Sequence, residues 1–338
     1  MIDLLVAGGG PAGLATAILG ARAGLEVVVV ERRHGPVDKA CGEGLMPHAV
    51  ALLGRLGVDA PGKPFHGITY LDGRHSVTGR FRGGTGRGVR RTALHAGLLE
   101  AASAAGVRIE HGEVGPVSQN ATSVHCSRFR ARYLAAADGL HSPIRTALGL
   151  ARPSGGPRRW GIRRHHVMTP WSDYVEVYWS DNSEAYVTPV ADDCVGVAIL
   201  TSRKGGFDAH LGSFPALRDR VCGRAHGPDR AAGPLRQKVI SRTAGRVLLV
   251  GDAAGYVDAL TGEGLGIAFG AAELLVDCVV ADRPQDYDRR WRRMSRRYRL
   301  LTSAVLQASE MPIVRSRIVP AAAQFPGVFR GVVNLLAE

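Results

Sequence analysis

The chain begins with two apolar runs that flank a helical segment. Residues 2–7, Ile-Asp-Leu-Leu-Val-Ala, and residues 26–30, Glu-Val-Val-Val-Val, have the character of strands buried on both faces. Residues 14–24 between them are apolar and rich in alanine, as in a helix packed on a sheet. We therefore predict a parallel βαβ unit at this end of the chain.

The middle of the chain has a different pattern. Residues 65–82 and 159–200 contain short alternating or apolar runs, for example 174–179, 184–189 and 194–200. No long helical segment separates these runs. Hairpin connections, and hence an antiparallel sheet, are expected here.

An arginine-rich segment follows nearer the C-terminus. From Arg289 to Arg299, seven of eleven residues are arginine. Apolar residues recur through and beyond this segment at steps of three and four, at Trp291, Met294, Tyr298, Leu301 and Val305. This spacing predicts a helix with an apolar face docked on the domain and a solvated basic face. Contact with a membrane surface is the alternative.

A glycine-rich turn joins the first predicted strand to the first helix. Gly8, Gly10 and Gly13 form the pattern G-x-G-x-x-G, with Pro11 and Ala12 inside it. The first glycine permits a tight turn, the second lets a pyrophosphate approach the backbone at the positive helix end, and the third lets the helix pack close to the strand. The pattern predicts a dinucleotide site.

The second predicted strand ends in Glu31, which Arg32 follows. Glu31 lies 18 positions after Gly13. A carboxylate at this place accepts hydrogen bonds from the hydroxyls of an adenosine ribose. The adenosine end of a dinucleotide is therefore expected beside Glu31 and Arg32.

Two later segments repeat the order of an apolar strand followed by a polar turn. Residues 132–137 and 245–250 are the two apolar runs, and a glycine-rich turn at 261–266 then begins a helix. The candidate residues at these turns are Asp138, Gly139, Asp252, Gly262, Gly264 and Leu265.

These three motifs resemble, in order and spacing, those of the superfamily of FAD-dependent monooxygenases and geranylgeranyl reductases. The resemblance implies an aspartate on the ribityl chain, a glycine-rich turn along the flavin ring, an Asp-Gly pair beside the pyrophosphate and an arginine that opens a helix and reaches FAD. By position these roles fall on Asp252, on Gly262, Gly264 and Leu265, on Asp138 and Gly139, and on Arg91. Non-covalent FAD is expected, with NADPH or NADH as a transient reductant.

The same resemblance implies an α/β fold, in which a Rossmann-type FAD-binding domain carries an inserted antiparallel-sheet substrate domain. We assign residues 1–64, 85–155 and 240–288 to the discontinuous FAD-binding domain. Residues 65–84 and 156–239 are assigned to the substrate domain, and residues 289–338 to C-terminal helices.

The loop after the second strand resembles the cysteine-containing loop beside the flavin in geranylgeranyl reductases. It contains Cys41 and Gly42, and Glu43 follows them. The aromatic Tyr-x-Trp-x-Phe-Pro strand of those reductases is absent, because residues 185–189 read Ala-Tyr-Val-Thr-Pro. We place Glu43 beside the substrate, together with Arg163 and Tyr186.

The sequence is compatible with two reactions. The first is NAD(P)H-dependent hydroxylation of an aromatic or polyketide-like small molecule through a flavin C4a-hydroperoxide, which needs few acid–base groups from the protein and leaves the catalytic residues unassigned. The second is reduction or dehydrogenation of a prenyl or quinone-like lipid. The missing aromatic strand and the unremarkable hydrophobicity favour the first.

Net charge and cysteine content bear on the partners and the location of the protein. The net charge of +13 suits a phosphate-bearing cofactor, an anionic membrane surface or nucleic acid. No aromatic platform for single strands is visible, so a nucleic-acid partner is not expected. The five scattered cysteines, with no signal peptide or membrane span, favour a cytoplasmic protein. No metal is expected, because His165 and His166 are adjacent on a predicted strand and point to opposite faces.

Overall fold

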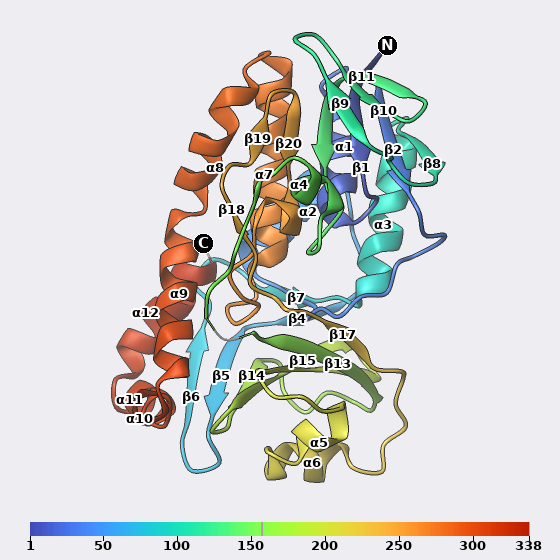
Figure 1. Cartoon of the computed structure of the whole chain (residues 1–338). Helices are drawn as coiled ribbons and strands as arrows, with labels where there is room; N and C mark the ends of the chain where they lie inside the picture. The colour runs from blue at the N-terminus through green and yellow to red at the C-terminus, as the bar shows by residue number, and fades with distance from the viewer. Residues whose placement is uncertain (157, 338) are drawn as a thin grey trace.

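A mainly parallel sheet forms one half of the molecule in the computed structural model, which describes residues 1–156 and 158–337 (Figure 1). Its strand order is β19-β20-β11-β1-β2-β8, and β9 and β10 extend it antiparallel beside β11. The central pairs from β20 to β8 are parallel. The strands are β1 (Ile2–Ala7), β2 (Val27–Glu31), β8 (Arg108–His111), β9 (Val117–Gln119), β10 (Val124–Cys126), β11 (Phe129–Ala136), β19 (Thr243–Ala244) and β20 (Val247–Leu249).

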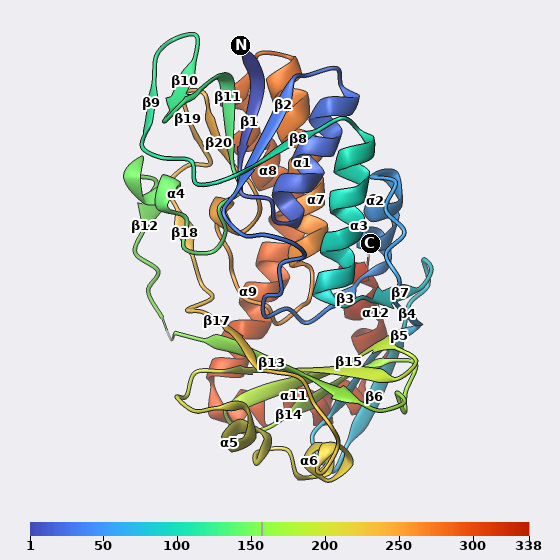
Figure 2. The same ribbon diagram turned by 90° about the vertical axis from the view of Figure 1, so that its right-hand side faces the viewer.

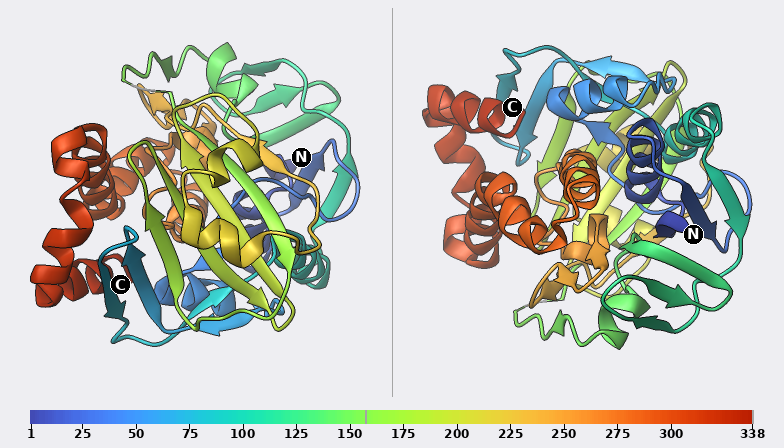
Figure 3. Two further views of the ribbon diagram at one scale, coloured as in Figure 1. Left: turned by 90° about the horizontal axis from the view of Figure 1, so that it is seen from below. Right: turned by 90° about the horizontal axis from the view of Figure 1, so that it is seen from above.

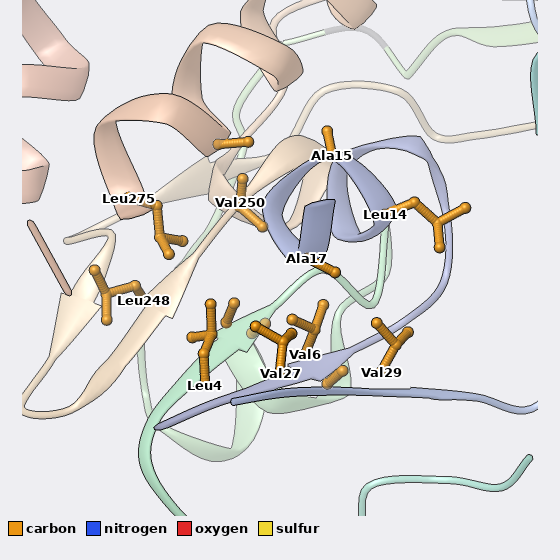
Figure 4. Close-up of a cluster of buried hydrophobic side chains, with 14 of the residues drawn as sticks. Leu4, Val6, Leu14, Ala15, Ala17, Val27, Val29, Leu248, Val250 and Leu275 are labelled. Atoms are coloured by element: carbon orange, nitrogen blue, oxygen red, sulfur yellow. The ribbon is translucent and has the colours of Figure 1, made fainter. Parts of the chain in front are cut away.

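Helices cover one face of this sheet. The helix α1 (Pro11–Arg22) packs between α3 (Arg91–Ala104) and α7 (Gly264–Val280), and α2 (Pro47–Arg55) packs on α7. Figure 4 shows side chains from α1, α7 and the strands meeting in this core, among them Leu4, Leu14, Val29, Leu248 and Leu275. The predicted βαβ unit and the α/β fold class are confirmed.

A second sheet of seven strands lies below the first, as Figure 2 shows. Its order is β17-β13-β16-β15-β14-β5-β6. All neighbouring pairs are antiparallel except β5 and β14, so the expectation of a purely antiparallel sheet was wrong at this pair. No hairpin joins these two strands, and turn geometry therefore does not force them to run in opposite directions. The strands are β5 (Gly67–Leu71), β6 (Ser76–Arg80), β13 (Trp160–Val167), β14 (Val175–Trp179), β15 (Ser183–Ala191), β16 (Cys194–Thr201) and β17 (Arg230–Ala232).

Alternation along the strands divides the second sheet into two faces. On β16, Val197 and Ile199 belong to a core with the short helices α5 (Phe207–Leu211) and α6 (Pro215–Val221). Ala198 and Leu200 point to the other side, toward the first sheet. One face of the sheet is therefore free to line a site between the two sheets.

Short elements connect the two halves. A three-stranded sheet, in the order β3-β7-β4, bridges them beside the predicted cysteine-containing loop. The remaining short elements are β3 (Gly44–Leu45), β4 (Lys63–Phe65), β7 (Gly86–Gly88), α4 (Pro143–Ala147), β12 (Ala151–Arg152), β18 (Lys238–Val239) and the 3-10 helices Gly251–Ala254 and Pro284–Asp286.

Five helices end the chain. The first of them packs on the first half of the molecule, and the later ones lie to one side of the second sheet (Figure 3). The five are α8 (Tyr287–Met294), α9 (Arg296–Glu310), α10 (Pro312–Arg315), α11 (Ile318–Gln324) and α12 (Pro326–Ala337). The domain boundary placed at residue 289 falls inside α8. Tyr287 and Trp291 of this helix pack in the core of the first half, so α8 belongs with that half. The segment predicted as one arginine-rich helix forms two helices, α8 and α9, which are separated at Ser295.

The last helix is tied to the edge of the second sheet. Asn334 on α12 accepts a hydrogen bond from the Arg82 backbone at 2.7 Å and donates one to the Arg80 carbonyl at 3.0 Å. Gly79 on β6 permits this approach, since a Cβ there would lie 2.8 Å from the Val333 side chain. Within the described part of the chain, no helix is both long and apolar enough to cross a membrane.

Candidate active site

A cavity of about 1520 Å³ lies between the two sheets. It collects the residues singled out in the sequence, all except Gly13, from segments that are far apart along the chain. Those that line it are Gly8, Gly10, Pro11, Ala12, Glu31, Arg32, Cys41, Gly42, Glu43, Arg91, Asp138, Gly139, Arg163, Tyr186, Asp252, Gly262, Gly264 and Leu265.

The glycine-rich turn forms one wall of the cavity. Gly8 has a φ of 106°, which favours glycine, and its N–H donates to the Val30 carbonyl at 2.9 Å. Apart from Gly10 and its two chain neighbours, no described residue has an atom within 4 Å of the place where a Cβ on Gly10 would stand, so the backbone there faces open space. Gly13 instead contacts the turn itself, which explains its absence from the cavity wall.

His95 supports the turn from α3, and sequence reasoning missed it. The Val37 N–H donates to Nδ1 of His95 at 3.3 Å, so the ring proton is on Nε2 and is donated to the Gly9 carbonyl at 2.7 Å. Burial lowers the pKa of His95, which keeps the ring neutral for this role. Its position four residues after Arg91, on the same helix face, was the available signal.

Glu31 stands at the end of β2, beside the glycine-rich turn. Its Oε2 accepts from the Gly9 N–H at 2.8 Å, and its Oε1 accepts from the Arg33 N–H at 3.0 Å. Each oxygen has one lone pair left, and the carboxylate can still accept from a ribose. Arg32 points away to Glu113 at 3.1 Å and is exposed.

Arg145 connects the turn at Asp138 to the turn at Asp252. The sequence did not predict this role. This buried side chain donates to the Leu140 carbonyl at 2.8 Å, just after the Asp138-Gly139 turn, and to the Ala253 carbonyl at 3.1 Å, just after Asp252. Because the guanidinium spans both turns, it fixes their separation across the cavity.

Positive charges surround Asp252. Burial raises the pKa of its carboxyl group, while the charges of Lys39, Arg91 and Arg145 act in the opposite direction. Lys39 also reaches toward Gly139, since its Nζ lies 3.6 Å from the Cβ position of that glycine. The N-terminus of α7, with Gly264 and Leu265, adds the positive end of a helix dipole. This part of the cavity is suited to an anionic, hydroxyl-rich ligand.

Several buried polar atoms in this region lack a hydrogen-bond partner among the described residues. Nε of Arg91 is such a donor, as are Nε of Arg145 and Nε of Arg163, and Oδ1 of Asp138 is such an acceptor. Buried polar groups are nearly always paired in native proteins, so these atoms indicate a ligand that both accepts and donates hydrogen bonds. With the open space at Gly10, they fit a dinucleotide whose phosphates accept and whose hydroxyls donate.

The loop after β2 is fixed by a buried polar network. Arg163 on β13 donates to Nδ1 of His165 at 2.9 Å, which places the ring proton on Nε2. That nitrogen donates to Oε2 of Glu43 at 2.6 Å, and Oε1 of Glu43 accepts from the Arg91 N–H at 2.8 Å. Arg163 also pairs with Asp38 in the same loop. The network joins both sheets to the start of α3.

This network changes how the three candidate substrate residues are interpreted. Glu43 is only 3% exposed and each of its oxygens accepts from a protein donor, and Arg163 is 1% exposed and paired. Their side chains thus orient the loop rather than present free charges to a substrate. Tyr186 lines the cavity with its ring, while its hydroxyl donates to the Leu260 carbonyl at 2.8 Å. His166 points to the opposite face, near Phe207, as the alternation predicted.

Cys41 faces the cavity from the same loop. The Glu43 N–H donates to its Sγ at 3.4 Å, and burial raises the pKa of the thiol. The thiol is therefore held protonated at neutral pH. Thr188 on β15 fixes the next residue by donating to the Gly42 carbonyl at 2.9 Å.

A large part of the cavity wall is apolar, and we call this part the apolar chamber. One side is the upper face of the second sheet and the other is formed by the C-terminal helices. The sheet contributes Ile68, Tyr70, Val175, Val177 and Leu200, and the helices contribute Val305, Ile318, Ala322, Phe325, Val328, Phe329, Val332 and Val333. None of these side chains is charged, so the chamber suits a hydrocarbon group.

The comparison with protein families fits this geometry. A model of the FAD binding domain matches residues 1–216. The chain belongs to this family. Menaquinone reductase from Mycobacterium tuberculosis (strain ATCC 25618 / H37Rv) is 29% identical over 334 residues, which cover 81% of this chain and 76% of the relative. The chloroplastic geranylgeranyl diphosphate reductase from Oryza sativa subsp. japonica is 26% identical over 324 residues, with coverage of 83% and 66%.

Solved structures show the same fold. A flavoprotein/dehydrogenase from Cytophaga hutchinsonii superimposes with a TM-score of 0.84 at 18% identity, over 99% of this chain and 92% of that one. The protein is accordingly an FAD-dependent oxidoreductase of the monooxygenase and reductase superfamily. FAD supplies the redox chemistry when bound, and the chain supplies the binding, orientation and exclusion of water.

We expect an Asp252→Ala protein to fold but to bind FAD about ten- to a hundred-fold more weakly. The substitution removes an acceptor for cofactor hydroxyls from the cavity wall, and a hydrogen bond to a charged group contributes roughly 1.5–3 kcal/mol. FAD titration of the apoprotein measures the effect, with Asp288→Ala, a paired carboxylate outside the cavity wall, as the control. Unchanged FAD affinity in Asp252→Ala would remove this residue from the site.

Proposed function

We propose that the protein reduces a lipid with a long isoprenoid chain, such as a prenylated quinone, at the expense of NADPH or NADH. The apolar chamber carries this proposal. It opens directly from the part of the cavity that holds the dinucleotide motifs, and uncharged side chains line it throughout. A substrate in the chamber therefore places one end beside Cys41 and the predicted flavin position.

The size of the cavity supports the proposal. Pockets for small ligands usually enclose about 300–1,000 Å³, and a volume of about 1520 Å³ leaves space for a cofactor and a bulky apolar group together. The names of the relatives point the same way, since one acts on menaquinone and another on a geranylgeranyl diphosphate. The absence of the aromatic strand at 185–189 does not remove the chamber, because β14 and the C-terminal helices build its walls.

The residues of this chain have distinct tasks in such a reaction. Phe329 and Val333 exclude water from the chamber, and Tyr186 presents a ring whose hydroxyl is already engaged. The network of Glu43, His165 and Arg163 fixes the loop that carries Cys41. The net reaction adds a hydride from NAD(P)H and a proton to a double bond, so NAD(P)⁺ and a product with two more hydrogens result.

The alternative predicted from the sequence, hydroxylation of an aromatic molecule, requires dioxygen. Strict anaerobiosis therefore separates the two reactions. The purified FAD-loaded protein is incubated with NADPH or NADH and either a polyprenylated quinone or a set of simple phenols, and products are identified by mass spectrometry.

We expect conversion of the prenylated lipid without oxygen, with a gain of two hydrogens. A product that carries one added oxygen atom and forms only in air would instead establish hydroxylation. If protein that retains FAD converts neither the prenylated quinone nor the phenols, both reactions would be excluded.

A further inference from the structure

The segment that connects α9 to α12 carries apolar side chains on its outside. Met311 is 58% exposed, Ile313 82%, Phe325 58% and Val328 68%. The same segment covers the apolar chamber with its inner face, through Ile318 and its neighbours. We call residues 311–330 the outer segment. Clustered exposed apolar residues of this kind mark interaction sites.

The apolar chamber reaches the surface at this segment. Phe325, at the end of α11, and Val328, at the start of α12, line the cavity and are also largely exposed. Figure 1 shows α10, α11 and the lower end of α12 together at one corner of the molecule, beyond the second sheet. A hydrocarbon chain that leaves the chamber here passes between exposed apolar side chains rather than into a polar groove.

The charge of the segment has one sign. Residues 311–337 include Arg315, Arg317 and Arg330 but no aspartate or glutamate. Arg317 and Arg330 are exposed, and no ion pair between described residues includes either of them. Two basic side chains next to exposed apolar ones complement a surface of hydrocarbon and anionic headgroups.

Arg315 fixes the segment to the second sheet. Its buried guanidinium pairs with Glu184 at 2.7 Å and donates to the Ser180 carbonyl at 2.6 Å and the Ser183 carbonyl at 2.8 Å. These contacts attach α10 to the second sheet in an orientation that leaves Ile313 exposed. This exposure belongs to the folded state.

We propose that the outer segment docks on an anionic lipid bilayer and opens the apolar chamber to it. Apolar residues enter the interface, Arg317 and Arg330 contact anionic headgroups, and the hydrophobic substrate passes from the bilayer at Phe325 and Val328 without crossing water. The passage of substrate rests on the proposed function, whereas docking rests only on the exposed residues. A second copy of the chain fits less well, because a symmetric contact would bring identical basic side chains together.

Binding to vesicles without any substrate tests the docking. Vesicles of phosphatidylcholine alone are compared with vesicles of equal parts phosphatidylcholine and phosphatidylglycerol, and bound protein is measured by sedimentation. We expect the wild type to prefer the anionic vesicles. The variant Met311→Ser/Ile313→Ser is expected to bind the anionic vesicles at least about tenfold more weakly than the wild type. The variant Arg317→Gln/Arg330→Gln is expected to lose roughly tenfold in affinity for the anionic vesicles only.

Matched variants control for general hydrophobicity and charge. Ile240→Ser/Val280→Ser removes two apolar residues, 57% and 54% exposed, from the FAD-binding half, and Arg296→Gln/Arg297→Gln removes two exposed arginines from the arginine-rich segment. Both are expected to bind like the wild type. FAD content and thermal unfolding verify that every variant is folded.

Three outcomes would overturn the proposal. The first is wild-type protein that binds neither kind of vesicle. The second is an effect of the control pairs as large as that of the outer-segment pairs. The third is a dimer in light scattering that Met311→Ser/Ile313→Ser dissociates, which would assign the surface to a second copy. None of these results depends on turnover, so they leave the proposed reaction to its own test.

Discussion

A Gly13→Ala protein is expected to lose at least about 3 kcal/mol of folding free energy and, with it, FAD binding. The alanine Cβ would lie 1.9 Å from the Gly8 carbonyl oxygen and 3.2 Å from the Ala137 side chain. Backbone cannot move aside as a flexible side chain does, and α1 is itself held between α3 and α7. Overpacking of this kind typically costs about 1–3 kcal/mol and more where relaxation is blocked.

Gly10→Ala is the matched control. The new Cβ has no described residue within 4 Å except its two chain neighbours, so the apoprotein should unfold at the wild-type temperature. The same methyl group would occupy the space predicted for the pyrophosphate, and FAD affinity should fall. Thermal unfolding of both apoproteins, followed by FAD titration, separates the two effects. Equal stability of the two variants would refute the packing role given to Gly13.

The cofactor end of the cavity was predictable because its signals are local. Gly8, Glu31 and Asp252 each stand where an apolar strand ends, and the carboxyl ends of neighbouring parallel strands meet at one sheet edge. Once the parallel strands are predicted, the turns that follow them are therefore expected at the same edge of the sheet. The supporting residues His95 and Arg145 stand on helices rather than at strand ends, and their partners are backbone carbonyls that no side-chain pattern encodes.

The apolar chamber was not predictable by the same means. Its sheet wall depends on which face each strand of the second sheet presents, and a shift of one residue exchanges the faces. Its other wall depends on how the C-terminal helices dock on β6, a contact between residues about 250 positions apart, as for Arg82 and Asn334. Neither spacing nor composition carries that information.

The arginine-rich segment shows how a correct periodicity leads to an incomplete interpretation. Its apolar positions do face the protein, as expected for one helix. The break at Ser295 divides them, however, so that Trp291 and Met294 pack in the core of the first sheet while Leu301 and Val305 pack beside the apolar chamber. One predicted helix face therefore serves two cores, and only the second belongs to the candidate site.

Glu43 illustrates a different limit. Its place beside Cys41 suggested a free carboxylate for a substrate hydroxyl, yet Glu43 is buried and its two oxygens accept from His165 and from the Arg91 N–H. These donors come from β13 and α3, which are distant in sequence. The residue type and the location were informative, whereas the direction of its hydrogen bonds required the fold.

Filling the apolar chamber should strongly lower activity toward long substrates. Ala322 on α11 lines the chamber, and an Ala322→Trp side chain would extend into it. If tryptophan displaces one isoprene unit, the lost burial amounts to roughly 3–4 kcal/mol at about 0.8 kcal/mol per carbon. We expect kcat/KM for a polyprenylated quinone to fall at least about 100-fold, with little change for an analogue without the chain.

Ala304→Trp provides the comparison, because Ala304 lies exposed on α9 outside the cavity wall. Both variants should retain FAD, since neither position adjoins the dinucleotide motifs. The ratio of kcat/KM for long and short substrates then reports the chamber alone, independent of how much active protein each preparation contains. A ratio in Ala322→Trp equal to that of Ala304→Trp would mean that the substrate does not enter the chamber, and the assignment of a long isoprenoid lipid would fail with it.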